Sequence, residues 1–385
     1  MATAGEESTV LLASYDLGEM DSHVNVSINF TNCSFDNSSY IPYELRPETY
    51  IVPIIFVLIF LVGFIGNGTL ILIVVLNKNM RSIPNIYITS LALGDFVVIV
   101  AGVPFISTIY TFESWPYGLV MCQVGEFLKD FSAGVTSLSL TSLSIDRFVA
   151  IIKPIHTYRD YCSKTRTIIC VTLIWIVSAL IALPGAYYSY LMELCANYRT
   201  IYVCYPFPEH MRPWYPKTLI IVKFLVLYLI PLIINTVNYY QISKHLRKVS
   251  VHKGLNDSEM KIALGRLKFA KISLILAVLF ATCFFFDHVF LIWFYFYPNA
   301  EDYYNTFWNL WRIVGFVLKF SNSCLNPLVL AHISGKFRGY FKNYLWQRWW
   351  CCKENANETL NLSTLKTLPS SSNRSTIHRV ATTKV

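Results

Sequence analysis

Residues 50–76 read YIVPIIFVLIFLVGFIGNGTLILIVVL, 27 residues without one charged side chain. A helix that crosses a bilayer needs about 20 consecutive apolar residues. This stretch therefore predicts a membrane-spanning helix and decides the class of fold. The whole chain agrees, because it is 54% hydrophobic and 14% charged with a mean hydropathy of +0.45, whereas a soluble domain has about 25% charged residues.

Six more apolar stretches follow, so the sequence predicts an all-α membrane protein with a seven-helix bundle. The expected spans cover residues 50–76, 84–110, 123–151, 168–188, 217–242, 269–297 and 307–331. Around them we expect an amino-terminal segment (1–49), the bundle (50–331), a surface-lying amphipathic eighth helix (332–350) and a disordered tail (351–385).

The distribution of charge predicts the orientation. The first 50 residues hold eight carboxylates and one basic residue, Arg46. Connections rich in Lys and Arg alternate with less basic ones, and basic connections lie on the cytoplasmic side. The amino terminus is therefore expected outside the cell and the carboxyl terminus inside. The formal net charge of +9 reflects this topology, so no nucleic-acid partner is expected. Residues 1–30 lack the pattern of a cleavable signal peptide.

Modification sites follow the same division. Four glycosylation motifs crowd the amino terminus, at Asn25, Asn29, Asn32 and Asn37. Four cysteines fall outside and allow three pairings, namely Cys33, Cys122, Cys195 and Cys204. Cys351 and Cys352 lie inside after a Trp-rich stretch and suit palmitoylation, or are two free thiols.

The end of the third span reads Leu143-Ser-Ile-Asp-Arg-Phe-Val-Ala-Ile-Ile-Lys-Pro154. A charge in the middle of a membrane helix costs about 2.5–3.5 kcal/mol on insertion scales. At a helix end, Asp146 and the snorkelling Arg147 reach headgroups and water. The pair is therefore predicted to form an ionic latch at one aqueous face.

This string resembles the region that ends the third helix of class A (rhodopsin-like) G-protein-coupled receptors, with Phe148 in place of the usual tyrosine. Other motifs of that family recur in order, at Gly66-Asn67, Leu91-Ala-Leu-Gly-Asp95, Trp175, Pro231, Tyr239 and Asn322-Ser-Cys-Leu-Asn-Pro327. Within the family, Lys78-Asn-Met-Arg-Ser-Ile-Pro-Asn85 is similar to bombesin receptors. Trp115-Pro-Tyr-Gly118 and Trp311-Arg-Ile-Val-Gly-Phe316 look like invertebrate CCHamide receptors.

The resemblance implies a short amidated neuropeptide as the extracellular ligand and a heterotrimeric G protein, chiefly Gq with calcium release, as the partner inside. It also implies a receptor kinase and arrestin acting on the Ser/Thr-rich tail, contact with membrane lipid, and no enzymatic activity. The disulfide implied by the family joins Cys122 to Cys204, which leaves Cys33 and Cys195 as a second pair.

Two sets of residues are carried over from the family. The switch set comprises Asp146, Arg147, Tyr239, Phe284, Asn326 and Pro327. A sodium ion is implied at Asp95, Thr136, Asn322, Ser323 and Asn326, although a water-filled polar pocket without an ion explains the same residues. Phe284 and Phe286 replace the tryptophan and proline of the sixth helix, and Leu330 replaces the tyrosine that follows Asn-Pro in the seventh. Without that proline the sixth helix is expected to be straighter.

A charged cleft is predicted near the outer face. Seven ionisable residues fall within the spans, toward their outer halves: Glu126, Lys129, Asp130, Asp287, His288, Arg312 and Lys319. Tyr205 and Phe316 complete the predicted ligand-binding set. Internal ion pairs that order the bundle are the alternative interpretation of these charges. An amidated peptide end suits Arg312 or a carboxylate through hydrogen bonds, and Glu126 or Asp287 suits a basic ligand residue.

Two other functions compete with a signalling peptide receptor. A decoy receptor that binds peptide without signalling is suggested by Phe284, Phe286 and Leu330. An opsin-type photoreceptor is suggested by Lys319 in the seventh span, where a retinal Schiff base could form. The sixth helix, however, lacks the tryptophan that packs on retinal.

Overall fold

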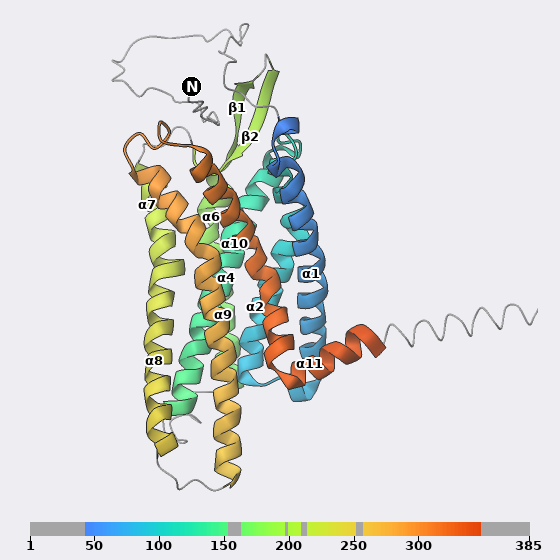
Figure 1. The fold of residues 1–385 in the computed structure, drawn as a ribbon, viewed down its shortest axis with the longest axis vertical. Helices are drawn as coiled ribbons and strands as arrows, with labels where there is room; N and C mark the ends of the chain where they lie inside the picture. Colours follow the sequence, from blue (N-terminus) through green and yellow to red (C-terminus); the bar gives the residue numbers. More distant parts are fainter. Residues whose placement is uncertain (1–42, 153–162, 197–198, 209–213, 252–256, 348–385) are drawn as a thin grey trace, which may run out of the picture. The chain divides into compact units, whose positions relative to one another are not determined.

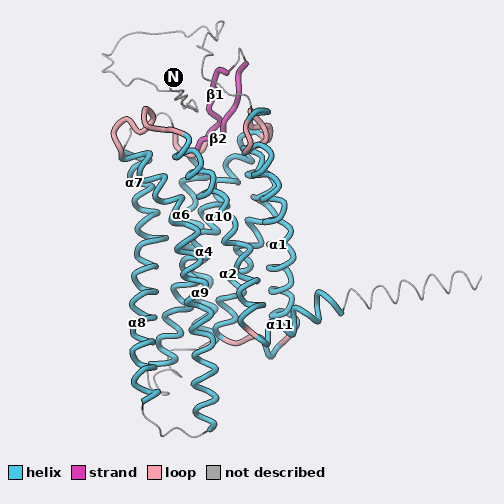
Figure 2. The backbone as a smooth tube through the Cα atoms, in the orientation of Figure 1, coloured by secondary structure: helices cyan, strands magenta, loops and turns pink. Residues whose placement is uncertain are grey.

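The computed structural model describes residues 43–152, 163–196, 199–208, 214–251 and 257–347. Within them, seven helical segments are long and apolar enough to cross a membrane, as predicted. They are α1 (Glu48–Leu76), α2 (Ile83–Ala101), α4 (Gly118–Ile152), α6 (Lys164–Tyr188), Trp214–His245, the part Leu267–Phe296 of α9 (Asp257–Phe296), and α10 (Thr306–Ile333). Figure 1 and Figure 2 show these segments running alongside one another.

The second span ends earlier than the predicted residue 110. α2 stops at Ala101, and Gly102 leads into the short α3 (Val103–Ile106) and a 3-10 turn, Ser107–Tyr110. Pro104 explains the break, because it has no N–H to donate to the carbonyl of Val100 four residues earlier. The apolar side chains after Ala101 therefore belong to a separate turn.

The fifth span changes its helical type in the middle. α7 (Trp214–Lys223) passes into a π-helical turn, Phe224–Leu229, and then into α8 (Ile230–Val251). Pro231 has no N–H to donate to the carbonyl of Leu227 four residues earlier. The hydroxyl of Ser137 in α4 donates to that carbonyl instead, over 2.6 Å, so the irregular turn keeps its acceptor satisfied.

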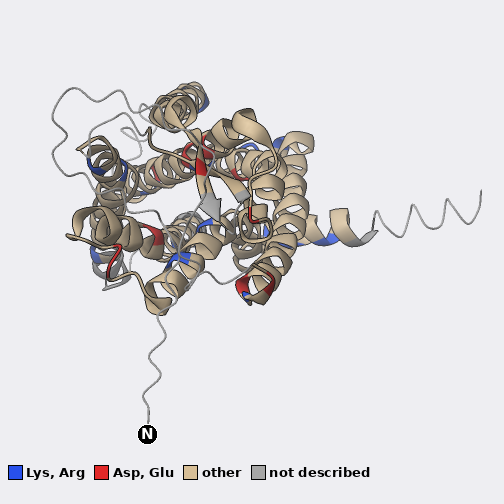
Figure 3. Cartoon of the chain, turned by 90° about the horizontal axis from the view of Figure 1, so that it is seen from above, with Lys and Arg blue, Asp and Glu red and all other residues tan. Residues whose placement is uncertain are grey.

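The bundle is apolar outside and contains its polar groups within. In α1, Ile54 and Leu58 are 64% and 57% exposed, whereas Phe56 is 2% exposed. Most of the ribbon carries no charge when the bundle is seen from above (Figure 3). Buried polar residues include Asn67, whose amide donates to the carbonyl of Ser323 over 2.8 Å. This arrangement suits lipid, which offers no hydrogen-bond partners.

A β-hairpin marks one end of the bundle, called here the hairpin end. β1 (Tyr190–Ala196) pairs antiparallel with β2 (Arg199–Tyr205), with Tyr190 opposite Tyr205. A disulfide joins Cys204 of β2 to Cys122 in the first turns of α4, which confirms the pairing implied by the family. Cys33, the side chain of Cys195, the four glycosylation asparagines, Cys351 and Cys352 lie outside what the structure describes.

The bundle belongs to one compact unit that extends through Arg338, and a second unit begins at Gly339. α11 (Gly335–Lys342) is followed in the second unit by a π-helical turn, Asn343–Gln347. An eighth helix is thus present within the predicted 332–350. Its contact with a membrane surface stays a prediction.

Candidate functional site

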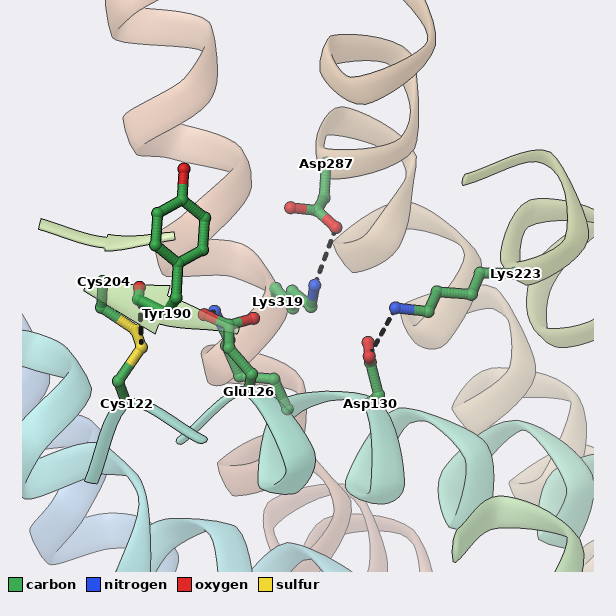
Figure 4. A network of polar contacts seen from close by, with 9 residues as sticks. Cys122, Glu126, Asp130, Tyr190, Cys204, Lys223, Asp287 and Lys319 are labelled. Carbon is green, nitrogen blue, oxygen red and sulfur yellow. Dashed lines mark hydrogen bonds and ion pairs between the residues drawn. A yellow bond between two sulfur atoms is a disulfide. The ribbon is translucent and has the colours of Figure 1, made fainter. Parts of the chain in front are cut away.

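Three ion pairs lie together near the hairpin end of the bundle. Nζ of Lys319 in α10 is 2.9 Å from Oδ2 of Asp287 in α9, and Nζ of Lys223 in α7 is 2.6 Å from Oδ2 of Asp130 in α4. Lys129 pairs with Glu126 one turn earlier in α4. Figure 4 shows the Asp287–Lys319 and Asp130–Lys223 pairs, Glu126 and the Cys122–Cys204 disulfide in one view. The side chains of the three ion pairs are 13–21% exposed, so water reaches them.

The pairs decide what the cleft can offer a ligand. Each of the three acids predicted for the cleft, Glu126, Asp130 and Asp287, already faces a lysine. Removing one partner of such a pair leaves a charge in a low-dielectric site. A basic ligand group would therefore have to displace an internal lysine. The pairs agree with the alternative interpretation of these charges, internal ion pairs that order the bundle.

Lys223 was missed by the sequence analysis. It is a basic residue within the predicted span 217–242, and a charge at that depth was the available signal. Its partner Asp130 fits against α6 because residue 185 is glycine. A Cβ added to Gly185 would lie 3.1 Å from Oδ2 of Asp130, so a larger residue would crowd the carboxylate.

Arg312 is the cleft cation without a carboxylate partner among the described residues. One terminal nitrogen donates to Oδ1 of Asn309 over 3.3 Å, and the buried Nε has no hydrogen-bond partner. The guanidinium carbon lies 5.8 Å from the ring centre of Tyr304. Burial raises the pKa of Tyr304, so its hydroxyl stays protonated and donates to Asn309 over 3.1 Å. With five N–H donors, Arg312 can hold a carbonyl or a carboxylate.

Aromatic rings surround these charges. The hydroxyls of Tyr205 in β2 and Tyr295 in α9 lie 3.3 Å apart. The His288 ring packs on Tyr228, with 4.7 Å between ring centres. Phe316 packs against Phe56 at 5.4 Å, as part of an apolar cluster between α1, α2 and α10. The structure thus places Phe316 in the apolar packing between the helices.

A polar core lies deeper in the bundle. Asp95 in α2 is fully buried, and its Oδ2 accepts a 2.6 Å hydrogen bond from Nδ2 of Asn326 in α10. Its Oδ1 accepts a longer one, 3.4 Å, from the hydroxyl of Thr136 in α4. Buried carboxylates need such donors or a bound ion. These contacts bring together three members of the predicted sodium set.

A small cavity adjoins this core. Its volume is about 10 Å³, roughly the space of one water-sized occupant. Its polar lining residues are Ser132, Thr136, Asn322, Ser323, Lys129 and Lys319. Hydroxyl and amide oxygens fit a small hard cation. No cluster of three or more His, Cys, Asp or Glu in the described residues is placed to hold a metal, so such an ion would depend on one carboxylate.

The predicted latch is at the opposite end of α4. Both side chains are buried, with Asp146 7% and Arg147 4% exposed. Nε of Arg147 donates to Oδ2 of Asp146 over 3.0 Å, and a terminal nitrogen donates to the same oxygen. The guanidinium carbon lies 5.9 Å from the ring centre of Phe269 in α9. Arg147 therefore lies where α9 and α4 meet.

Other switch residues lie in the packing between the spans. Tyr239 packs with Ile242 and Ala270, and Phe148 lies against the same cluster. Phe284 is 5% exposed, and its ring centre lies 4.5 Å from that of Phe280. Leu330 is fully buried. These positions agree with switch roles in the interior, which stay predictions.

Seven spanning helices, three ion pairs near the hairpin end and a buried Asp–Arg pair at the other end are the arrangement that the sequence predicted for a multi-pass membrane receptor. Residues 66–330 match the family described as 7 transmembrane receptor (rhodopsin family). The chain belongs to this family, which is one of receptors and not of enzymes.

Similar proteins narrow the branch. The chain is 43% identical over 326 residues to the Neuropeptide CCHamide-1 receptor of Drosophila melanogaster, covering 84% of this chain and 65% of that protein. It is 34% identical over 311 residues to Bombesin receptor subtype-3 of Ovis aries, covering 78% of this chain and 75% of the relative. The chain thus spans just under two thirds of the length of the CCHamide-1 receptor. Both names agree with the branch suggested by the sequence motifs.

Proposed function

We propose that this protein is a plasma-membrane receptor for a CCHamide- or bombesin-like neuropeptide that binds at the hairpin end. The observation that carries the proposal is Arg312, a partly buried guanidinium whose buried Nε has no hydrogen-bond partner and which lies beside the ring of Tyr304. An amidated peptide end offers a neutral carbonyl, which Arg312 can bind without competing with an internal ion pair. The names of the relatives support a peptide ligand.

The ligand signal is passed to a heterotrimeric G protein at the other end of the bundle. In this proposal Arg147 leaves Asp146 on activation and contacts the G protein, chiefly Gq with calcium release. The hairpin end faces outside and the Arg147 end faces the cytoplasm, as the basic connections predict. A receptor kinase and arrestin act on the tail, and membrane lipid surrounds the bundle.

A sodium ion in the polar core is part of the same proposal. Asp95, Thr136, Asn322, Ser323 and Asn326 would hold it. Of this set, Thr136, Asn322 and Ser323 line the small cavity, which supports the proposal. When bound, the ion would neutralise the buried carboxylate. The residues themselves bring three spans together at Asp95, through the hydrogen bonds from Asn326 and Thr136.

A peptide panel tests the proposal. Cells that express the receptor with an epitope tag are exposed to amidated CCHamide- and bombesin-like peptides, while calcium release and fluorescent peptide binding are measured. Saturable binding with calcium release is expected. Neither response, with intact surface receptor, overturns the proposal. Binding without calcium release or G-protein recruitment identifies the decoy receptor instead.

A further inference from the structure

One face of α10 contacts a two-residue segment of α9. Nε1 of Trp311 donates to the carbonyl of Phe286 over 3.0 Å. Two turns later Nζ of Lys319 lies 2.9 Å from Oδ2 of Asp287. Trp311, Gly315 and Lys319 are spaced by four residues, so they share one face of the helix.

Gly315 lets the two backbones meet between those contacts. A Cβ added at Gly315 would lie 3.0 Å from the backbone N of Asp287 and 3.1 Å from the carbonyl carbon of Phe286. Backbone atoms cannot move aside as a flexible side chain can. A larger residue at 315 would therefore push α9 away from α10.

α9 is suited to transmit a movement at this point. It runs from Asp257 to Phe296 as one α-helix without a proline or a π-helical turn, two of the usual causes of a sharp kink. Lys268 lies 19 residues before Asp287, about 28 Å along a helix that rises 1.5 Å per residue. We therefore expect that, when the contact at Asp287 is released, the helix tilts as one rigid body and the part at Lys268 is displaced.

The geometry points to a clamp in which Trp311, Gly315 and Lys319 of α10 hold Phe286 and Asp287 of α9, and the Asp287–Lys319 ion pair is the part that opens. Both side chains of the pair are 19% exposed, so a polar ligand group can compete for either partner. The contact at Gly315 is between backbone atoms, so it contains no charged side chain for which a ligand could compete. The opening of the clamp by a peptide rests on the proposed function. The clamp itself restrains α9 whether or not a ligand is present.

Distance measurements test the clamp without any peptide. Lys78, in the connection after α1, and Lys268 in α9 are both exposed. Each is replaced by an unnatural amino acid that carries a spin label. Pulsed electron paramagnetic resonance then gives the distance between them in purified receptor. We expect one population in the unaltered receptor and an additional, longer one in Asp287→Asn and in Lys319→Gln. The double variant D287N/K319Q, which leaves no lone charge, is expected to show it too.

The charge-swapped variant D287K/K319D is expected to restore the original distance. Asp130→Asn is the matched control, because the Asp130–Lys223 pair has similar exposure, 16% and 19%, but joins α4 to α7. The clamp is overturned if the Asp287 and Lys319 variants keep the original distance, if the swap does not restore it, or if D130N lengthens it equally. A silent peptide panel with the longer population still present would refute the ligand and leave the clamp standing.

Discussion

Nδ2 of Asn326 in α10 donates a 2.6 Å hydrogen bond to Oδ2 of Asp95 in α2, 231 residues earlier in the chain. The contact joins the second and seventh spans at a fully buried carboxyl group. Thr136 adds the third span through its hydroxyl. Asp95 is therefore the point at which three helices are held by one side chain.

Asp95→Ala should lower the stability of the purified receptor. The substitution leaves the Asn326 amide and the Thr136 hydroxyl without their acceptor and opens a cavity, at a cost of about 2–4 kcal/mol. Thermal unfolding in detergent, followed by tryptophan fluorescence, measures the effect. Asp95→Asn keeps the shape and one acceptor oxygen, so its loss should be smaller. Equal melting of D95A and the unaltered receptor would contradict the structural role.

Sodium should raise the melting temperature of the purified receptor by binding at Asp95. Purified receptor in NaCl is expected to unfold at a higher temperature than in choline chloride at equal ionic strength, because an ion bound to the folded state stabilises it. The gain should disappear in Asp95→Asn. If both salts give the same melting temperature, the polar core is a pocket without an ion.

The fold and this core were predictable because membrane spans and their motifs are local signals. An uncharged stretch such as 50–76 predicts a membrane-spanning helix from its own residues, without information on its neighbours. The order of the family motifs placed Asp95 and Asn326 in the correct spans. The end of α2 was not predicted, because residues 101–110 are as apolar as a span. Hydropathy does not register that Pro104 interrupts the helix.

Arg312→Ala should weaken peptide potency by about tenfold to a hundredfold, the range that corresponds to one hydrogen bond to a charged group. Arg312→Lys is the informative companion, because lysine keeps the charge but loses the planar set of donors. Concentration–response curves for calcium release, normalised to surface receptor, measure both. Unchanged potency in R312A would remove Arg312 from the ligand site.

The joint variant C122A/C204A should lose most surface receptor. The disulfide closes a loop with a sequence separation of 82 residues, and the chain-entropy estimate for such a loop is about 4.5 kcal/mol. Flow cytometry of an epitope-tagged receptor measures surface display. Cys170→Ser, at a cysteine outside the disulfide, serves as the control. Normal display of C122A/C204A would show that the hairpin is held by its other contacts.

The partners of the cleft charges could not be predicted from the sequence. Asp130 pairs with Lys223, 93 residues later, although Lys129 and Lys319 are also cationic residues of the same cleft. Which acid meets which base depends on helix rotation and side-chain rotamers, whereas hydropathy reports only that a charge is present. The interpretation as internal pairs was open beforehand, and the structure favours it for all three acids.

Phe286→Pro tests whether the straightness of α9 restrains the receptor. Proline at 286 removes an N–H inside the helix and adds a clash, which costs about 3 kcal/mol. It should also shift the Phe286 carbonyl that accepts the hydrogen bond from Trp311. We therefore expect a lower melting temperature and higher calcium signalling without ligand. Phe286→Ala separates the two causes, because it removes the ring that lies 4.7 Å from Trp311 and leaves the backbone bonds intact. If F286P and F286A behave alike in both assays, the ring and not the unbroken helix provides the restraint.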